Sequence, residues 1–471
     1  MAIKKFYATK DNTITNAFKG LTTVRATGSN VGAADALEVY KVYDRIEDSA
    51  TELSRVIIQF DTDDIASKRT SGDIPESGSV SFFLNLFNAR HPFTVPENVA
   101  LLVQPLSKSW DEGRGVDLDT YTDTGVSNWV SASSTQAWAS AGGDYVSGYD
   151  KTFTLETGIE DLSIDITDIV EDTLNSTLTN YGLGIRLSGT LETDEQNYYT
   201  KKFFARTSEF FFKRPTIEAR WDSSIKDQRG DFYVSSSMLS TENLHEVYLY
   251  NNFRGTPTNI PAVGTGAIYV KLFDAESGGS ELSSSVSVSY PITGGFAETG
   301  VYSCSFDLST TASTVYDRWF DSSLTTCFYT GTINLKTYSA QQDNKQEPLI
   351  LTITNLKDVY TTSEKDARIR LYTRKRNWSP TIYTVAKTEI ENYFVDSIYY
   401  KVIRKVDNEE VVSYGTGSTN HTLLSYDKQG SYFDFDFSLL EAGTGYDFKF
   451  IIKEGTNYNE YPTSFTFRVE E

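Results

Sequence analysis

"FFARTSEFFFKRPTIEARW" (residues 203–221) places six aromatic and four basic side chains within nineteen residues. Such a stretch fits two different structures. It can be a surface that grips nucleic acid or a sugar, because aromatic faces stack on bases and rings. It can also be the closing hairpin of a β-sandwich, in which the aromatic side chains fill the core. The rest of the sequence has to decide between them.

Composition favours a β-sandwich. Aromatic residues make up 14% of the 471 residues, with 30 Tyr and 28 Phe, whereas Pro and Met are few. Short apolar runs alternate with stretches of Ser, Thr, Gly, Asn and Asp, which is typical of many short strands joined by polar turns. At roughly 150 residues per domain, the chain is long enough for about three domains.

The charge distribution argues against nucleic acid as a partner. The formal net charge is −21. Residues 1–225 carry 21 Lys and Arg against 33 Asp and Glu, residues 226–355 carry 7 against 13, and residues 356–471 carry 15 against 18. Because phosphate binding needs a positive face, an acidic balance in every section disfavours a nucleic-acid binder.

Two cysteines, Cys304 and Cys327, are too few for a disulfide framework. We expect them on neighbouring strands, as small buried hydrophobic side chains in a protein assembled in a reducing cytoplasm. The first residues lack the apolar core of a secretory signal, and no run approaches 18 consecutive apolar residues. These features predict a soluble protein without a membrane partner that is not exported by the standard route.

Period-two alternation predicts strands throughout the first half. In residues 54–60, Val56, Ile58 and Phe60 point to one face, while Arg55 and Gln59 point to the other. Four further runs repeat this pattern, with inward positions at Val80, Phe82, Leu84 and Leu86; Leu162, Ile164 and Ile166; Leu183, Ile185 and Leu187; and Ile217, Ala219 and Trp221.

A single helix is expected in this half, at residues 166–177, with Thr167 as its N-cap. Residues 222–231 are polar and turn-rich, which is typical of a linker. They include the tripeptide Arg-Gly-Asp at residues 229–231, to which we give no functional weight. The predicted architecture is all-β, with domains at residues 1–222, 223–355 and 356–471.

Each of the two later domains shows its own strand pattern. In the second, Ile268, Val270 and Leu272 alternate as inward residues. In the third, "LLEAGTGYDFKF" (residues 439–450) resembles the tyrosine corner of immunoglobulin-like and fibronectin-type sandwiches, with Tyr446 leading into a strand. The corresponding leucine and glycine are Leu440 and Gly443.

Six segments of the first domain, in order, resemble the DNRLRE family, a jelly-roll domain related to carbohydrate-binding modules. They cover about residues 10–221. The segments are "GSNVGAADALEVY" (28–40), "SRVIIQFDTDDI" (54–65), "VQPLSKSWDEG" (103–113), "IDITDIVEDTL" (164–174), "TNYGLGIRL" (179–187) and residues 203–221. The resemblance implies a jelly roll that closes with the last of these segments.

This resemblance answers the opening question in favour of the closing hairpin. Residues 203–204 would end one strand, residues 205–209 would hold a turn, and Arg214-Pro215 would begin the last strand, where proline is tolerated. We expect Arg206 to be a buried or half-buried hydrogen-bond hub and all six aromatic residues to be core.

The whole chain also resembles virion proteins of tailed phages, especially phages of marine and cyanobacterial hosts. The segments that carry this likeness are "MAIKKFYATKDNTITNAF" (1–18), residues 28–40, "YYTKKFFARTSEFFFKRPTIEARW" (198–221) and "LSYDKQGSYFDFDFSLLEAGTGYDFKF" (424–450). The resemblance implies an architectural function, in which the domains are displayed on, or cement together, a capsid, neck or tail.

No residue is predicted to be catalytic, cofactor-binding or metal-ligating. The three histidines, His91, His245 and His421, fall in different predicted domains, and no His or Cys pair has metal-ligand spacing. Two acidic clusters allow two interpretations. Their carboxylates could hold calcium, or they could be turn aspartates that bond their own backbone, which we favour. The clusters are Asp61, Asp63 and Asp64, and Asp117, Asp119 and Asp123.

Two further features are candidate contact surfaces. Trp110, Trp129 and Trp138 lie in a loop-rich stretch and could form a sugar-binding platform, although we favour their packing as a satellite core. The basic residues of 368–376 could be a solvated strand face, or they could contact an acidic neighbouring subunit in a salt-sensitive way. These residues are Arg368, Arg370, Arg374, Lys375 and Arg376.

The sequence therefore predicts a non-enzymatic structural component of a phage virion that needs no cofactor. It would assemble, as a homo-oligomer, with other capsid, neck or tail proteins after synthesis in the host cytoplasm. The alternative is an adhesin on the virion that binds a host-surface glycan through residues 110–138.

Overall fold

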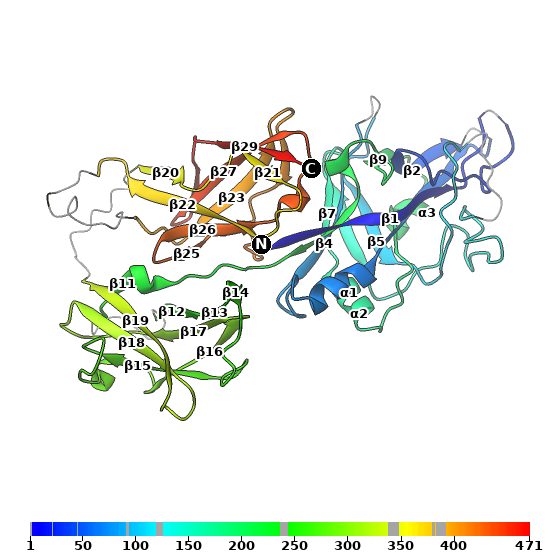
Figure 1. Cartoon of the computed structure of the whole chain (residues 1–471). Coiled ribbons are helices and arrows are strands. Elements are labelled where there is room, and N and C mark those ends of the chain that lie inside the picture. The colour runs from blue at the N-terminus through cyan, green and yellow to red at the C-terminus, as the bar shows by residue number, and fades with distance from the viewer. Residues whose placement is uncertain are drawn as a thin grey trace. The chain divides into compact units, whose positions relative to one another are not determined.

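The computed structural model is mostly β, with 44% strand and 8% helix. It describes the chain except for Met1, Leu21, Arg45 and residues 91–93, 119–125, 236–243, 338–347, 379–381 and 383–391. The residues form two compact units (Figure 1). The N-terminal unit consists of Ala2–Asp222 with Gly417–His421, and the C-terminal unit consists of Ser223–Thr416 with Thr422–Glu471.

A ten-stranded sheet system forms the N-terminal unit. Its main path runs β6-β5-β8-β3-β1-β10-β4-β7, and β2, which pairs with both β3 and β9, lies off this path. The strands are β1 (Ile3–Thr15), β2 (Ala36–Asp44), β3 (Ser49–Phe60), β4 (Ser81–Leu86), β5 (Val99–Pro105), β6 (Lys151–Leu155), β7 (Leu162–Asp165), β8 (Leu183–Leu187), β9 (Tyr199–Phe204) and β10 (Thr216–Arg220).

Strand β1 connects two parts of this sheet. Its residues 3–7 pair antiparallel with β10, from Ile3 opposite Arg220 to Tyr7 opposite Thr216. Its residues 8–15 pair antiparallel with β3, and the register shifts between Ala8 and Lys10. The last strand of the unit is therefore hydrogen-bonded to the first.

The predicted alternation is confirmed in the core of this unit. Val56, Ile58 and Phe60 of β3 pack in one cluster with the predicted inward residues of β4, β7, β8 and β10, of which only Ile164 is partly exposed. Ile57 is also fully buried, but it belongs to a second cluster on the opposite face of β3. Both faces of β3 are therefore covered.

Three short α-helices accompany the strands in the described part of this unit. The predicted one is confirmed as α2 (Thr167–Leu174), although its N-cap is Ile166, one residue earlier than expected. Helix α1 (Thr62–Thr70) stands where the acidic residues at 61–64 were expected to form a turn. The Asp61 side chain caps it by accepting hydrogen bonds from the N–H groups of Asp63 and Asp64. Helix α3 spans Gly189–Thr193 and was also not predicted.

The predicted closing hairpin is wrong. Strand β9 pairs with β2, whereas β10 pairs with β1 and β4, so the two strands do not hydrogen-bond to each other. Pro215 directly precedes β10, as expected. The aromatic residues are not all core either, because the Phe210 side chain is 49% exposed. A pattern of apolar residues identified the strands but not their partners.

The C-terminal unit contains three larger sheets. A seven-stranded sheet has the order β11-β19-β18-β15-β16-β17-β12, a four-stranded sheet has the order β20-β22-β26-β25, and a six-stranded sheet has the path β21-β29-β27-β23-β24 with β28 beside β27. A small hairpin, β13 with β14, is separate. The predicted division of this unit at residue 355 stays a prediction.

The strands of the C-terminal unit are β11 (Phe232–Tyr233), β12 (His245–Tyr250), β13 (Asn252–Phe253), β14 (Thr256–Pro257), β15 (Ile268–Phe273), β16 (Ile292–Glu298), β17 (Val301–Phe306), β18 (Thr314–Phe320), β19 (Cys327–Lys336), β20 (Leu349–Ile353), β21 (Val359–Thr361), β22 (Ala367–Lys375), β23 (Ile398–Arg404), β24 (Glu409–Val412), β25 (Ser425–Asp427), β26 (Gly430–Phe435), β27 (Gly445–Glu454), β28 (Asn457–Glu460) and β29 (Phe465–Glu470). The predicted inward residues Ile268, Val270 and Leu272 are fully buried in the core of the seven-stranded sheet.

Aromatic side chains fill the core between the four- and six-stranded sheets. Phe433 of β26 stacks on Tyr400 of β23, with ring centroids 4.4 Å apart, and meets Phe448 of β27 edge-on at 5.3 Å. The predicted tyrosine corner is confirmed. The buried Tyr446 hydroxyl donates to the Glu441 carbonyl at 2.8 Å and accepts from the Glu441 N–H at 3.0 Å.

Two other expectations for this unit are wrong. Cys304 lies on β17 and Cys327 on β19, and three strands separate them in the sheet. Cys304 is buried as expected, but Cys327 is exposed. The segment at 222–231 is not an open linker, because Asp227 and Arg229 are buried. None of the helices that the structure describes is long and apolar enough to span a membrane.

Candidate functional site

The candidate sugar-binding tryptophans lie in the long connection after β5, which folds back over the outer face of β3. Trp110, Trp129 and Trp138 are only 2%, 8% and 5% exposed. We call their cluster the loop cap. It comprises Ile14, Ile57, Leu106, Trp110, Trp129, Ala132 and Trp138.

Hydrogen bonds fix the loop cap from within. The Trp110 indole N–H donates to the Tyr181 carbonyl at 2.9 Å, and the Trp138 indole N–H donates to the Asn128 carbonyl at 2.8 Å. A buried indole needs such an acceptor, because an unpaired N–H in the core is costly. Both tryptophans are therefore bound at the polar edge as well as packed on their faces.

The face of Trp129 is covered by a cation. The Arg55 guanidinium lies 5.2 Å from its ring centroid, forms a two-bond ion pair with Glu192 at 2.9 and 2.7 Å, and donates to the Gly142 carbonyl at 2.8 Å. Because these three tryptophans are buried, they do not present the open faces that a sugar-binding platform would need, which is the interpretation that the sequence disfavoured. The favoured interpretation, a satellite core, is confirmed.

Arg206 is the hydrogen-bond hub that the sequence predicts. Its guanidinium binds both carboxylate oxygens of Glu112, at 2.6 and 2.5 Å, and its backbone N–H donates to Asp11 at 2.6 Å. Glu112 also accepts the Asp11 backbone N–H at 2.8 Å. The side chain of Arg206 is 32% exposed, so the hub is half-buried.

Two carboxylates share this hub, and their environments differ. Burial raises the pKa of Asp11 to about 7; the negative charge of Glu112 adds to the rise, whereas the N–H and guanidinium of Arg206 oppose it. A raised pKa in a carboxylate pair is one mark of an acid–base site. Here every contact joins chain segments to one another, which is also how structural ion-pair networks behave.

The acidic clusters form no cation site among the described residues, where no three His, Cys, Asp or Glu side chains gather. Asp61 caps α1, and the exposed Asp63 and Asp64 lie in its first turn. Of the second cluster, Asp119 and Asp123 lie outside the described residues, as does His91. The backbone-bonding interpretation is confirmed for Asp61.

The basic stretch lies on the outer face of the four-stranded sheet, where acidic neighbours pair with two of its arginines. Arg368 forms two bonds to Asp434 of β26, at 2.8 and 2.9 Å, and Arg370 forms two bonds to Asp427 of β25, at 3.0 and 2.9 Å. Both guanidinium groups lie over the Tyr432 ring, 4.1 and 5.4 Å from its centroid.

These pairs favour the solvated-face interpretation over contact with an acidic subunit. Neutralised cations contribute little long-range attraction. Of the other three basic residues, Arg374 and Lys375 end β22 and Arg376 follows it. The Lys375 ammonium lies over the Tyr393 ring at 5.3 Å.

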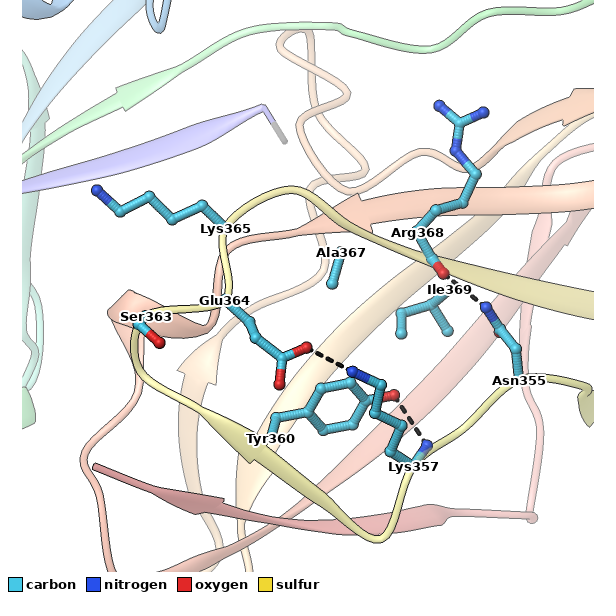
Figure 2. Close-up of a pocket in the computed structure, with 9 residues that line it drawn as sticks. All are labelled: Asn355, Lys357, Tyr360, Ser363, Glu364, Lys365, Ala367, Arg368 and Ile369. Carbon is cyan, nitrogen blue, oxygen red and sulfur yellow. Dashed lines mark hydrogen bonds and ion pairs between the residues drawn. The ribbon is translucent and has the colours of Figure 1, made fainter. Parts of the chain in front are cut away.

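A hollow of about 500 Å³ lies beside the loop that joins β21 to β22. Figure 2 shows its wall, in which Lys357 reaches across to Glu364 above the ring of Tyr360. Lys357 binds Glu364 at 2.7 Å, and its backbone N–H donates to the Tyr360 hydroxyl at 3.0 Å. The Lys365 side chain extends away from this ion pair.

The hollow offers little unused bonding capacity. The side-chain amide of Asn355 is bonded to the backbone of β22 at two points. It donates to the Arg368 carbonyl at 2.7 Å and accepts the Arg370 N–H at 2.8 Å. The Tyr360 ring is stacked on Phe437, with centroids 3.9 Å apart. Sequence reasoning missed this hollow. The only local signal was the polar run 357–368 before an alternating strand.

Comparisons with known proteins leave the family open. No protein-family model and no curated protein matches the chain. Among solved structures, the chain is weakly similar to the Yersinia pseudotuberculosis adhesin InvE, with 14% identity and a TM-score of 0.16. That match covers 49% of this chain and 60% of the adhesin chain. A TM-score this low supports no inference about fold or function.

Proposed function

We propose that this protein is a non-enzymatic structural component of a tailed-phage virion, in the capsid, neck or tail. In this proposal residues 1–222 form a jelly roll of the DNRLRE type. Residues 223–355 and 356–471 form two immunoglobulin- or fibronectin-like sandwiches. The chain would be made in the host cytoplasm and would join other virion proteins as a symmetric homo-oligomer.

One observation carries the proposal: the residues behind the family resemblance bind one another. Trp110 donates to the Tyr181 carbonyl at 2.9 Å, and Glu112, from the same segment as Trp110, forms the ion pair with Arg206. Asn180 donates to the Phe60 carbonyl at 2.8 Å. Four segments distant in sequence are thus interlocked, and side chains used in this way serve architecture rather than a ligand.

The surface suits assembly through many weak contacts. A net charge of −21 keeps single copies soluble and apart. Broad sheet faces and strand edges then supply modest contacts, which become strong when they are repeated around a ring or vertex. A specific interface of this kind buries on the order of 1,600 Å² in total.

The test is the composition of purified particles of the phage that encodes the chain. We expect salt-washed, gradient-purified virions to contain the protein at a copy number matching one ring or one set of vertices, measured by quantitative mass spectrometry. An image of the intact particle would then locate it. Its absence from washed virions would overturn the proposal.

The adhesin alternative would need a surface other than the loop cap. A glycan array probed with the full chain tests it directly. Binding that survives in the Trp129→Ala variant would place a glycan site elsewhere on the protein.

A further inference from the structure

Residues 225–231, which the sequence predicts to be part of a linker, form a segment with buried charges that we call the strap. It contains a 3₁₀ turn at Gln228–Gly230. Asp227 is 3% exposed and Arg229 is 6% exposed, although both lie in a run of polar residues. A buried charge is stable only when it is paired and hydrogen-bonded, so the partners of these two residues show what the strap holds.

Arg229 is inserted into the seven-stranded sheet. Its guanidinium forms an ion pair with Asp317 of β18 and donates to the Tyr248 carbonyl of β12 at 3.0 Å. Asp317, which is fully buried, also accepts the indole N–H of Trp319 at 2.6 Å. Gly331 of β19 completes the socket, because a β-carbon at this position would collide with the Arg229 guanidinium and lie 2.6 Å from the Asp317 carboxylate.

The other side of the strap is bonded to the four-stranded sheet. The Tyr426 N–H of β25 donates to the Ile225 carbonyl at 2.9 Å, and the Asp227 N–H donates to the Tyr426 carbonyl at 3.0 Å. The strap thereby adds a short parallel rung to the edge of this sheet. Gly230 packs against Phe394 so closely that a β-carbon would lie 2.8 Å from the ring.

We propose that the strap locks the seven-stranded sheet to the four-stranded sheet, so that the C-terminal unit opens only when the Arg229 socket opens. Withdrawing Arg229 would leave Asp317 buried without its cation, which is among the costliest local changes in a protein. The backbone rung at Ile225–Asp227 is too short to hold alone, so it opens together with the socket. The Arg-Gly-Asp tripeptide therefore serves as an internal lock: Arg229 fills the socket, and Asp231 pairs with Lys336 at 2.6 Å.

Limited trypsin digestion of the full chain tests the lock. Lys226 and Arg229 are cleavage sites within the strap, and Arg254, in the turn of the exposed β13–β14 hairpin, is an internal reference site. In the wild type we expect the Arg254 site to be cut at least about tenfold faster than the strap, because proteolysis requires local opening.

Two variants disrupt the lock, one by a substitution in the socket and one by a substitution in the strap. Gly331→Ala fills the socket without changing the strap, and Arg229→Gln removes the cation but leaves Lys226 as a cleavage site. In both we expect cleavage after Lys226 to reach the rate at Arg254, while cleavage at Arg254 stays unchanged. Thr332→Ala, one position along β19 with a partly exposed side chain, is the matched control and should behave as the wild type. Strap cleavage in either variant that stays as slow as in the wild type would overturn the proposal.

Hydrogen exchange in the wild type tests the lock even if the variants do not fold. The backbone N–H groups of Asp227 and Tyr426 should be protected at least about a hundredfold relative to an unstructured peptide, as in sheet interiors. Exchange of these two amides at the rate of an open loop would contradict the lock.

Discussion

Trp129 in the loop cap lies under the guanidinium of Arg55, whereas Phe433 in the C-terminal unit is surrounded by other aromatic rings. Both side chains are buried, but different forces hold them. The loop cap depends on ion pairs between residues far apart in the chain, such as Arg55 with Glu192. The aromatic core depends on apolar area and ring packing, which a local alternating pattern specifies.

The largest effect should come from the aromatic core. The Phe448 ring lies 4.5 Å from Phe467 and 5.3 Å from Phe433. Phe448→Ala should lower the free energy of unfolding of the C-terminal unit by about 3–5 kcal/mol, because it leaves a cavity among these rings. Denaturant titration followed by near-ultraviolet circular dichroism measures it. Phe253→Ala, at a side chain 63% exposed, is the control and should change it by less than about 0.5 kcal/mol.

The hub of the N-terminal unit should give a pH-dependent effect of nearly the same size. The pKa of Asp11 rises from 3.8 in the unfolded chain to about 7 in the fold. Between these values the folded state binds more protons at Asp11 than the unfolded state does, so the contribution of Asp11 to stability is fully present below about pH 4 and is lost as the pH rises to 7. Loss of this contribution should lower the free energy of unfolding by about 2–4 kcal/mol between pH 4 and pH 7.

Asp11→Asn isolates this contribution. Urea unfolding at pH 4 and pH 7, followed by tryptophan fluorescence, should show that the variant lacks the decline due to Asp11. Four of the six tryptophans lie in residues 1–222, so this signal reports chiefly on the N-terminal unit. Asp64→Asn, at an exposed position of α1, should keep the wild-type pH profile. If Asp11→Asn keeps the wild-type pH profile, Asp11 does not control how stability changes between pH 4 and pH 7.

The ion pair of Arg55 with Glu192, which covers Trp129 of the loop cap, should contribute somewhat less to the free energy of unfolding. Arg55→Met leaves Glu192, whose side chain is 7% exposed, with only Arg186 nearby at 3.6 Å. We expect a loss of about 2–3 kcal/mol, since breaking one half of a buried pair leaves an uncompensated charge. The double variant Arg55→Met/Glu192→Leu should recover most of this loss. If it is as unstable as the single variant, the loop cap depends on packing more than on the pair.

The smallest effect should come from the hydroxyl of the corner tyrosine in the aromatic region. Tyr446→Phe removes both hydrogen bonds between the hydroxyl and Glu441 but keeps the ring. The expected loss is about 1–2 kcal/mol. Tyr458→Phe, at a side chain 40% exposed, is the matched control. Equal losses in the two variants would mean that the corner tyrosine acts through its ring alone.

The sequence predicted what local patterns encode. Inward residues of β3, β4, β8, β10 and β15 alternate as expected, and helix α2 and the Tyr446 corner are present. Tryptophan burial was also the favoured interpretation. In each case the burial periodicity or a short motif lies within about a dozen residues, so no knowledge of distant partners was required.

What the sequence did not predict depends on distant partners. Helix α1 buries only Ile65, so its apolar pattern is too weak to separate it from a loop. The strap looked like a linker because the partner of Arg229, Asp317, lies 88 residues further along. Strands β9 and β10 looked like a hairpin because they are close in sequence, yet each pairs with another strand. Polarity alone does not show whether a charge meets water or a buried partner.

The pairing of β1 with β10 also constrains how the chain is made. Residues 8–15 of β1 meet β3 within the first 60 residues, but β10, the strand that pairs with residues 3–7, is complete only when residues 216–220 have been synthesised. At about 5–20 residues per second, that interval lasts roughly 10 to 40 s. During this interval the nascent polypeptide exposes an unpaired strand edge. Chaperones that bind this edge, or a large distance from other nascent chains, would then determine the yield of assembled protein.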